Sequence, residues 1–473
     1  MTLLIVIPIL GALALLVVPK RFAWQAAIAI ALAAFGQGLA LIGGPLPLTE
    51  RHTWIPSIGA QFLLHLDGIS LLFVLLTTLM SLLGILASPK MPRLFYAMLL
   101  LLEAGCLGVF LAQDLLLFFV CFEAVLVPMY FLIGIWGAEQ RQYAAFKFFL
   151  YTAVGSVSLL VGILAFYFQS GLGTFELPVL LNASLPLATE RLIFWALFLG
   201  FAIKIPMFPF HTWLPDAHTQ APTAGSVMLA AVMLKMGTYG FLRISLPMLP
   251  KASIDGTIVQ TLGILSLIAI LYGGLICLVQ KDWKRLIAYS SVSHLGFCTL
   301  GLFSLNSTGI TGSVLQQINH GISTGLLFLL VGFAYERRHT RRIDAYGGLG
   351  KSMPGFTLVF GTAMLSSIGL PLLNGFIGEF TILRGVYLAH PWWAGVAIIG
   401  IVLSAAYMLS LYRHTVLGPI THEENRHLPD LSLREWAISA PLIGWAIWIG
   451  VRPDWHFHLI EGPVEQIMGR LRP

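Results

Sequence analysis

Long apolar stretches separated by short polar connections recur along the whole chain. Because about 20 consecutive apolar residues can cross a bilayer as an α-helix, the pattern predicts about fourteen transmembrane helices. Their expected positions lie near residues 2–19, 23–43, 67–87, 94–111, 114–136, 144–168, 191–210, 222–245, 256–279, 284–304, 311–334, 356–388, 393–417 and 434–452. The longest connections, near 44–66 and 335–355, are short for a folded unit. The sequence therefore predicts an all-α integral membrane protein without an aqueous domain.

Composition supports the membrane class. The chain has 473 residues, of which 58% are hydrophobic and 10% are charged, and its mean hydropathy is +0.86. Such a chain cannot keep its apolar surface inside a water-soluble globule. The net charge of +6 comes from basic residues gathered in alternate connections, so it indicates membrane topology rather than nucleic-acid binding.

The basic connections predict an orientation. Their basic residues are Lys20, Arg21, Lys90, Arg93, Arg141, Lys147, Lys281, Lys284, Arg285 and the RRHTRR run at 337–342. By the positive-inside rule these connections face the cytoplasm, which places both termini on the outer side. The first apolar stretch has no basic residues before it and no clear small-residue cleavage site, so we expect a retained helix rather than a signal peptide.

Familiar cofactor motifs do not occur in the sequence. The four cysteines lie singly in apolar stretches without C-x-x-C spacing, which argues against iron–sulfur, zinc and disulfide roles. There is no G-x-G-x-x-G after a strand and no P-loop, which argues against nicotinamide and nucleotide binding. We therefore expect no cofactor and no metal in this chain.

The remaining chemistry lies in ionisable residues within the apolar stretches. A charge at bilayer depth costs about 2.5–3.5 kcal/mol on insertion scales, so each such residue is a functional candidate. The candidates are Glu123, Lys204, Lys235, His294, His320, Glu379 and Glu103. The competing interpretation is structural: buried ion pairs or snorkelling for the lysines and Glu123, and satisfied core side chains for the histidines and Glu103.

Prolines and glycines interrupt two of the long stretches. Pro206 and Pro209 follow Lys204, and each removes an amide donor, so the helix must break and expose carbonyl groups. A second interruption lies in IGLPLLNGFIGEF, where glycine, proline and asparagine residues break another long stretch just before Glu379: Gly369, Pro371, Asn374, Gly375 and Gly378. Broken helices at matching positions of two halves are typical of inverted-repeat transporters.

Residue spacing extends this pattern to two five-helix units. Glu123 and His294 lie 171 positions apart, and Lys204 and Glu379 lie 175 positions apart. We predict helices 1–3 within 1–93, a first inverted repeat of helices 4–8 within 94–245, a second of helices 9–13 within 256–417, and helix 14 at 434–452. Helices 7 and 12 are the expected broken ones.

Several long segments resemble one known family. HTWLPDAHTQAPTAGSVMLAAVMLKMGTYGFLR, FEAVLVPMYFLIG, DWKRLIAYSSVSHLGF and GFIGEF are similar, in content and order, to the M-subunit family of bacterial NADH–quinone oxidoreductase (respiratory complex I), the counterpart of mitochondrial NADH dehydrogenase subunit 4. The resemblance covers most of the chain. Related families are the L and N subunits and the large subunits of sodium/proton antiporters, which usually carry lysine where this chain has Glu379. An acid there resembles the M type, as does APTAGSV after His218.

The resemblance implies a proton-translocating membrane-arm subunit, in the bacterial plasma membrane, of a redox-driven enzyme. It implies that Glu123 pairs with Lys204 and modulates its proton affinity. It also implies a proton relay through Lys204, Lys235, His294 and Glu379, in which Glu379 is the exit toward the outer half of the membrane. Secondary relay candidates are His211, His218, His320 and Glu103. FMN, iron–sulfur clusters and quinone would belong to partner subunits. The expected neighbours are L-type and N-type subunits and membrane lipids, and no nucleic acid is expected to bind.

Two other functions remain open from the sequence. One is a subunit of a multi-subunit sodium/proton antiporter, and the other is a membrane spacer whose polar residues only aid assembly. Neighbouring genes for flavin and iron–sulfur subunits would favour the enzyme. Inactive but assembled complexes with neutralised side chains would exclude the spacer.

Overall fold

The computed structural model describes residues 1–471, and nearly all of its regular structure is helical. The first part contains α1 (Thr2–Leu15), η1 (Lys20–Phe22), α2 (Ala23–Leu39), β1 (Leu48–Ile55), η2 (Pro56–Ile58), β2 (Ala60–Leu66) and α3 (Gly68–Leu86). Next come α4 (Arg93–Leu111), α5 (Leu115–Ala124), α6 (Leu126–Trp136), α7 (Arg141–Ser170), α8 (Leu177–Leu180) and α9 (Leu187–Lys204). After α10 (Trp213–Gln220), the eighth predicted helix is built from α11 (Thr223–Met228), η3 (Leu229–Met233), α12 (Lys235–Gly240), η4 (Phe241–Ser245) and α13 (Leu246–Met248). The short α14 (Pro250–Ser253) follows it.

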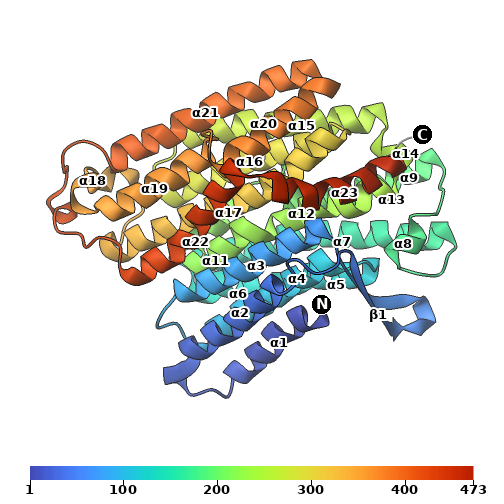
Figure 1. Cartoon of the computed structure of the whole chain (residues 1–473), viewed down its shortest axis with the longest axis horizontal. Coiled ribbons are helices and arrows are strands. Elements are labelled where there is room, and N and C mark those ends of the chain that lie inside the picture. The colour runs from blue at the N-terminus through green and yellow to red at the C-terminus, as the bar shows by residue number, and fades with distance from the viewer. Residues whose placement is uncertain (472–473) are drawn as a thin grey trace.

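The second half has the same helical character. It contains α15 (Gly256–Leu278), α16 (Trp283–Leu302), α17 (Ser307–Arg338), η5 (Ile343–Ala345), α18 (Leu349–Ser352), α19 (Pro354–Ser367), α20 (Asn374–Ala389), α21 (Pro391–Thr415), η6 (Glu423–Asn425), α22 (Leu433–Val451) and α23 (Asp454–Leu471). Figure 1 shows the long helices lying side by side along the longest axis of the molecule. α1 begins and α23 ends toward the β1 side, which we call the hairpin end, while α18 lies at the opposite end.

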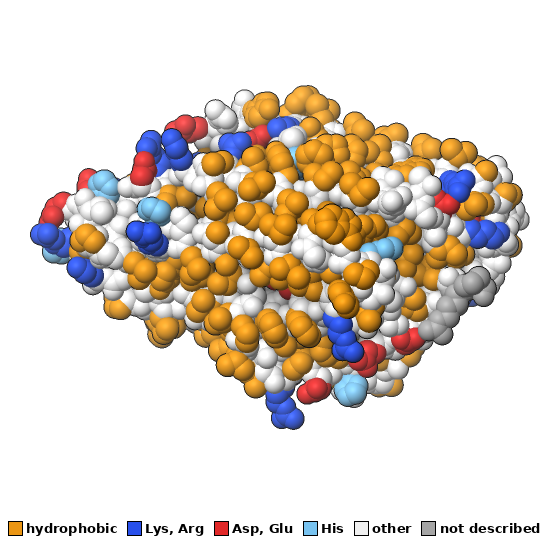
Figure 2. Space-filling view, turned by 90° about the horizontal axis from the view of Figure 1, so that it is seen from above, with side chains coloured by type: hydrophobic (Ala, Val, Ile, Leu, Met, Phe, Trp, Pro, Cys, Tyr) orange, Lys and Arg blue, Asp and Glu red, His pale blue; other side chains and the backbone are white. Residues whose placement is uncertain are grey.

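Nine helices among residues 1–471 are long and apolar enough to cross a membrane. The other predicted ranges coincide with helices that are shorter, interrupted or more polar: α1, α9, α16, the α19–α20 pair and α22. Figure 2 shows hydrophobic side chains over the broad middle of the surface, with charged side chains mainly at its ends and along its edges. Exposed leucine, valine and phenylalanine side chains on α7 and α21 are expected where a protein surface faces lipid. The protein is therefore embedded in a membrane and crosses it several times.

Three segments form the interior of the bundle. The most apolar windows of α3, of α17 and of the α11–α13 segment are each 94% buried, whereas those of α7 and α21 are only 39% buried. α17 packs against helices from both halves, including α3, α11, α16, α19, α20, α22 and α23. A polar side chain on α17 is therefore shielded from lipid and can meet side chains from both halves.

Both predicted helix breaks are present. α9 ends at Lys204, and α10 does not begin until Trp213, while residues 368–373 separate α19 from α20. Two irregularities were not predicted. The fifth predicted helix is interrupted at Val125 between α5 and α6, where Pro128 cannot donate the amide hydrogen bond that a continuous helix requires. The π-helical segments η3 and η4 flank α12, and such segments occur often at functional sites.

The connection at 44–66 departs from the expected all-α fold. It forms an antiparallel β1–β2 hairpin in which Leu48 lies opposite Leu66, with an irregularity between Thr53 and Ile55. At its tip Gly59 has a φ of +69°, and a Cβ atom there would lie 2.0 Å from the carbonyl oxygen of Gly173. The tip therefore packs directly on the connection after α7. Strands form here because the segment lies beyond the apolar stretches and its backbone groups need partners of their own.

The basic connections meet at the end opposite the hairpin. Lys284 Nζ donates to the carbonyl oxygen of Ala221 at 2.5 Å. Two backbone hydrogen bonds join further connections: the amide of Ile343 donates to the carbonyl of Lys281 at 3.0 Å, and the amide of Ala138 donates to the carbonyl of Gln220 at 2.9 Å. We call this the basic end. The clustering that the sequence predicts for these loops is therefore present in the folded chain.

Candidate functional site

Four ionisable side chains from four helical segments form a row inside the bundle. Lys235 begins α12, His320 lies in α17, His294 lies in α16, and Glu379 lies in α20. Each is at most 3% exposed. We call these four residues the central row. They come from positions up to 144 apart in the sequence, so only the packing of α17 between the two halves brings them together.

Lys235 occupies one end of the central row. Its Nζ donates to the carbonyl oxygen of Ala230 at 2.5 Å and lies 2.7 Å from Nδ1 of His320. Ala230 belongs to the π-helical segment η3, where the amide of Leu234 reaches back five residues to Leu229. The carbonyl that accepts from the lysine therefore belongs to this π-helical segment. A buried ammonium needs such partners, because it is strongly unfavourable without them.

Glu379 occupies the other end. Its Oε1 lies 3.0 Å from Nδ1 of His294 and accepts a hydrogen bond of 3.1 Å from Nε2 of Gln316. The break before α20 brings Gly369 close to the carboxylate. Gly369 has a φ of +77°, and a Cβ atom there would lie 3.0 Å from Oε2 of Glu379, so a glycine suits both the turn and the close approach.

The two histidines connect these ends. The ring centres of His294 and His320 are 5.7 Å apart, and the rings are tilted by 54°. Nε2 of His294 also lies 3.4 Å from the hydroxyl of Tyr407 and 3.5 Å from Oγ of Ser367. Nε2 of His320 is buried without a hydrogen-bond partner in the described part of the chain. Imidazole can accept a proton on one nitrogen and release it from the other, which suits both residues to relay chemistry.

The expected contact between Glu123 and Lys204 is not formed. Within residues 1–471, no ion pair of 4.0 Å or less joins them. Glu123 instead accepts a hydrogen bond from Ser156 Oγ, and the ammonium of Lys204 lies 4.8 Å from the ring centre of Phe122, a cation–π distance. Lys204 is 3% exposed, as expected for a buried charge.

The burial expected for Glu123 is also incorrect, because this residue is only partly buried in the folded chain. Its neighbours Val120 and Val127 are 44% and 53% exposed, so Glu123 lies toward the outer side of the α5–α6 segment. The phenyl ring of Phe122, by contrast, packs inward against Lys204 and Phe201. Helical geometry therefore separates the charge of Glu123 from the buried ammonium.

The secondary candidates other than His320 lie outside the central row. His218 is fully buried in α10 and stacks on Phe328 with ring centres 4.5 Å apart. His211 lies in the break after α9, with its ring centre 5.0 Å from that of Tyr272. Neither imidazole has a hydrogen-bond partner among residues 1–471. Glu103 in α4 accepts a hydrogen bond of 2.7 Å from Ser81.

Sequence reasoning gave too little weight to His320 and missed several polar residues. His320 stands between Lys235 and His294, whereas the sequence assigned it only a secondary place. The missed residues are Gln316, Ser367, Tyr407 and the Asp67–Arg243 ion pair of 2.5 Å. Lys284, which is buried and bonded to the Ala221 carbonyl, was interpreted only as a sign of membrane topology. The available signal was weak: a buried glutamine or tyrosine within an apolar stretch. Helical spacing alone does not show which helices face one another.

The described residues contain no group of three His, Cys, Asp or Glu side chains arranged to hold a metal ion. All four cysteines have free thiols. What the central row offers is a set of groups that can each bind and release one proton. Its chemistry is therefore acid–base chemistry within a buried interior.

Known proteins resemble this chain along almost its full length. Residues 112–404 match the family described as NADH:quinone oxidoreductase/Mrp antiporter, TM. NADH-quinone oxidoreductase subunit M of Rickettsia typhi is 46% identical over 425 residues, which cover 89% of this chain and 85% of that protein. NADH-ubiquinone oxidoreductase chain 4 of Marchantia polymorpha is 41% identical over 465 residues, which cover 95% and 93%.

A solved structure is similar over the whole fold. A chain in respiratory complex I from Thermus thermophilus with bound NADH matches with a TM-score of 0.94 and 32% identity, over 100% of this chain and 99% of that one. The matched family region at 112–404 includes both helix breaks and the whole central row. Although the family description also names Mrp antiporters, the similar proteins at 41–46% identity carry complex I names, which favours the complex I interpretation over the antiporter.

Proposed function

The chain belongs to the family of NADH-quinone oxidoreductase subunit M and is a proton-translocating membrane-arm subunit of that multi-subunit membrane enzyme; from this premise we propose that the central row carries the protons. One observation supports the assignment above all. Lys235, His320, His294 and Glu379 follow one another across an apolar interior, with contacts of 2.7 Å at one end and 3.0 Å at the other. Charges at this depth are costly, and proton relays in membranes are built from such groups.

The proposed transfer runs from Lys235 toward Glu379. The ammonium of Lys235 passes a proton to Nδ1 of His320, which lies within hydrogen-bonding distance. Nε2 of His320 can then release a proton toward His294, and a water molecule suffices to bridge rings whose centres are 5.7 Å apart. Nδ1 of His294 finally hands a proton to the carboxylate of Glu379, which becomes neutral. Each step moves one proton and needs no electron carrier.

Lys204 and Glu123 belong at the start of this route. Lys204 is buried at the end of α9, where the exposed carbonyl groups of a helix C-terminus favour a cation. Glu123 follows Phe122, whose ring centre lies 4.8 Å from the ammonium of Lys204, so the carboxylate lies near the ammonium without forming an ion pair. We propose that approach or withdrawal of this carboxylate shifts the proton affinity of Lys204. His211, His218 and Glu103 lie beside the route and have no hydrogen bond to the central row among the described residues.

An exit from Glu379 toward the hairpin end is supported by a cavity. This cavity has a volume of 520 Å³ and is lined by residues of α17, α20 and α23, among them Thr311, Arg384 and Glu461. Thr311 precedes Gln316 by five residues, or about 7.5 Å along a helix. Because Gln316 donates a hydrogen bond to Glu379, α17 leads directly from the carboxylate to the cavity.

The membrane setting completes the proposal. We propose fourteen crossings, with two inverted five-helix repeats at 94–245 and 256–417, and with the basic end in the cytoplasm of a bacterial cell. Both termini then lie outside. L-type and N-type antiporter-like subunits are the proposed neighbours in the bacterial plasma membrane, and FMN, iron–sulfur clusters and quinone are assigned to partner subunits.

Replacing His320 tests the proposed route. In His320→Asn the amide oxygen can still accept a hydrogen bond from Lys235, but the side chain cannot carry a proton. Because a positioned proton-transfer group contributes about 10²–10⁴-fold, we expect proton transport coupled to quinone reduction to fall by about tenfold or more. The measurement uses the assembled complex in liposomes with a pH-sensitive dye, and electron flux is recorded in the same vesicles.

A matched control is available in α23. His456 is also fully buried, and its Nε2 accepts a hydrogen bond of 3.0 Å from Trp445, but it lies outside the row. His456→Asn should retain parental transport if the complex assembles. Parental transport in the assembled His320→Asn complex would refute the route through His320.

A further inference from the structure

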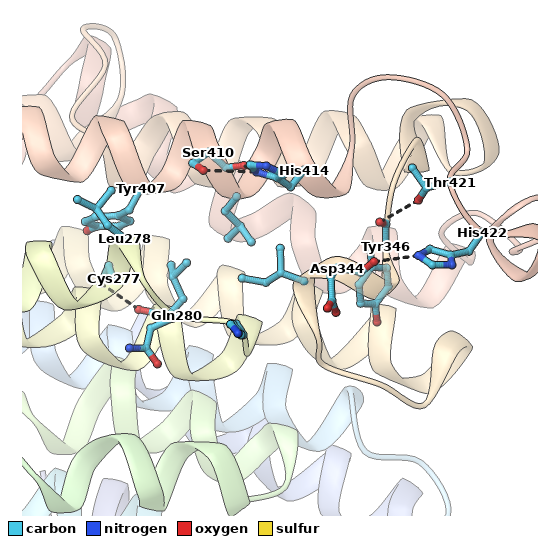
Figure 3. A pocket seen from close by; sticks show the side chains of 14 residues that line it. Cys277, Leu278, Gln280, Asp344, Tyr346, Tyr407, Ser410, His414, Thr421 and His422 are labelled. Carbon is cyan, nitrogen blue, oxygen red and sulfur yellow. Dashed lines mark hydrogen bonds between the residues drawn. The ribbon is translucent and has the colours of Figure 1, made fainter.

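A second cavity opens at the basic end, on the opposite side of the row from the exit described above. It has a volume of 480 Å³ and lies between α15, the beginning of α16, η5, α21 and the connection after α21. Its lining includes Lys281. Figure 3 shows Asp344, His414, His422 and Tyr407 around the same cavity. It is therefore lined by groups that can hydrogen-bond to water, although most of the surrounding surface is apolar.

Tyr407 connects this cavity to the central row. The residue is only 1% exposed, yet it lines the cavity. Its hydroxyl lies 3.4 Å from Nε2 of His294 and 3.2 Å from Oγ of Ser404. His294 in turn lies 3.0 Å from Glu379 through its other nitrogen. One phenol thus separates the cavity from the histidine–glutamate pair.

The cavity wall forms a polar track along one face of α21. Tyr407, Ser410 and His414 lie three and four residues apart, which places them on the same side of the helix. Nδ1 of His414 lies 2.7 Å from the carbonyl oxygen of Ser410, and Nε2 of His422 lies 2.9 Å from that of Asp344. Figure 3 shows Tyr407 at one end of this track and His422 near the other.

We propose that this cavity is a second proton-uptake route, in which Tyr407 delivers protons from the basic end to His294 and Glu379 without passage through Lys204 or Lys235. The inference rests on the proposed function of the His294–Glu379 pair. It assigns a role to Tyr407 that differs from those of the lysines and His320. It also gives the two halves of the chain separate entrances to a shared acceptor, which takes one proton from each entrance in turn during every cycle, so blocking either entrance slows the whole cycle.

The transfer balances without any co-reactant. A protonated water in the cavity gives its proton to the Tyr407 oxygen while the phenol O–H bond breaks and a new N–H bond forms at Nε2 of His294. The proton on Nδ1 of His294 then moves to the Glu379 carboxylate. The tyrosine ends as a neutral phenol, the histidine as the neutral Nε2–H form and the glutamate as a neutral acid. The histidine must return to its Nδ1–H form before the next transfer.

A conservative substitution tests the role of Tyr407. Tyr407→Phe keeps the ring and removes the hydroxyl. Tyr412→Phe on the same helix is the control, because within residues 1–471 the Tyr412 hydroxyl donates to the carbonyl of Thr357, at 3.4 Å, and not to the central row. Water can occupy part of the space that the hydroxyl leaves. We therefore expect proton transport to fall by about tenfold in Tyr407→Phe, which is less than the about 10²–10⁴-fold that a direct acid–base group contributes. The solvent deuterium isotope effect on proton transport should rise in Tyr407→Phe alone, which a purely structural defect would not produce.

Filling the cavity provides a second test. Ser410→Trp places a large ring inside the track, whereas Leu409→Trp places it on the neighbouring face of α21, where Leu409 is 49% exposed and does not line the cavity. We expect transport by the assembled complex in liposomes to fall in Ser410→Trp and to persist in Leu409→Trp. Parental transport in either Tyr407→Phe or Ser410→Trp would overturn the second route.

Glu379→Gln separates the inference from the function on which it rests. If Glu379→Gln abolishes transport while Tyr407→Phe and Ser410→Trp retain it, only the second route fails. If Glu379→Gln itself retains parental transport, the proposed role of the histidine–glutamate pair fails first.

Discussion

The two acid–base pairs that the sequence placed at equivalent positions differ in the folded chain. In the second half, His294 and Glu379 are buried and lie 3.0 Å apart. In the first half, Glu123 and Lys204 are not in contact. Glu123 is partly exposed and accepts a hydrogen bond from Ser156, while the ammonium of Lys204 lies against the ring of Phe122. Similar spacing along the sequence therefore accompanies two different electrostatic arrangements.

The position of each acid explains this difference. Glu379 follows the break between α19 and α20, where a glycine lets the backbone approach the carboxylate closely. Glu123 lies on a helix that continues, after one irregular residue, as α6, and it is directed toward a surface that also carries exposed valines. A carboxylate in contact with its partner is suited to transfer protons. A carboxylate at a distance is suited to change the charge of its neighbour.

The largest expected effect on proton transport comes from replacing Glu379, the acid that is in contact with its partner His294. Glu379→Gln retains hydrogen bonding to Gln316 but cannot titrate, so we expect proton transport to fall by about 10²-fold. Glu379→Asp should keep much of the activity. Glu379→Lys should be no better than the amide, because a cation beside His294 opposes protonation of that histidine. Protons moved per electron in liposomes measure all three, and parental transport in Glu379→Gln would show that protons leave without this carboxylate.

An intermediate effect is expected at Lys235, which belongs to the first half and contacts the second through His320. Lys235→Arg keeps a positive charge that can bond to the Ala230 carbonyl, but an arginine does not release its proton at physiological pH. We expect about tenfold slower transport, at the low end of what a proton-transfer group contributes. Normal proton-to-electron ratios and rates in this variant would remove Lys235 from the relay, while assembly on native gels serves as the control for folding.

The smallest effect is expected at Glu123. For a partly exposed charge interaction worth about 1 kcal/mol, Glu123→Ala should slow transport by about fivefold, well below the effect at Glu379. Glu123→Asp should be milder still. Transport rates of the two variants, measured beside Glu379→Gln, test the ranking. An equally severe loss in Glu123→Ala would indicate that the carboxylate contacts Lys204 during turnover, and the contrast between the halves would then disappear.

Local sequence signals located both helix breaks correctly. Proline and glycine act on the backbone within a few residues, so the breaks after Lys204 and before Glu379 could be located without knowledge of the fold. The π-helical segments beside Lys235 had no such signal, since no proline or unusual composition marks them. Their presence depends on packing around the interior segment that they flank.

The sequence by itself determined that this protein is a membrane-embedded helical chain with buried acids and bases, because hydropathy and the cost of a charge in lipid are properties of each residue and its near neighbours. Only the tertiary structure decided which of these groups touch. It placed His320 between Lys235 and His294, kept Glu123 from Lys204, and set Tyr407 between a cavity and the central row. Proton transfer requires contacts of a few ångströms, and such contacts between distant helices depend on how each helix is rotated and packed, which the spacing of residues along the chain does not specify.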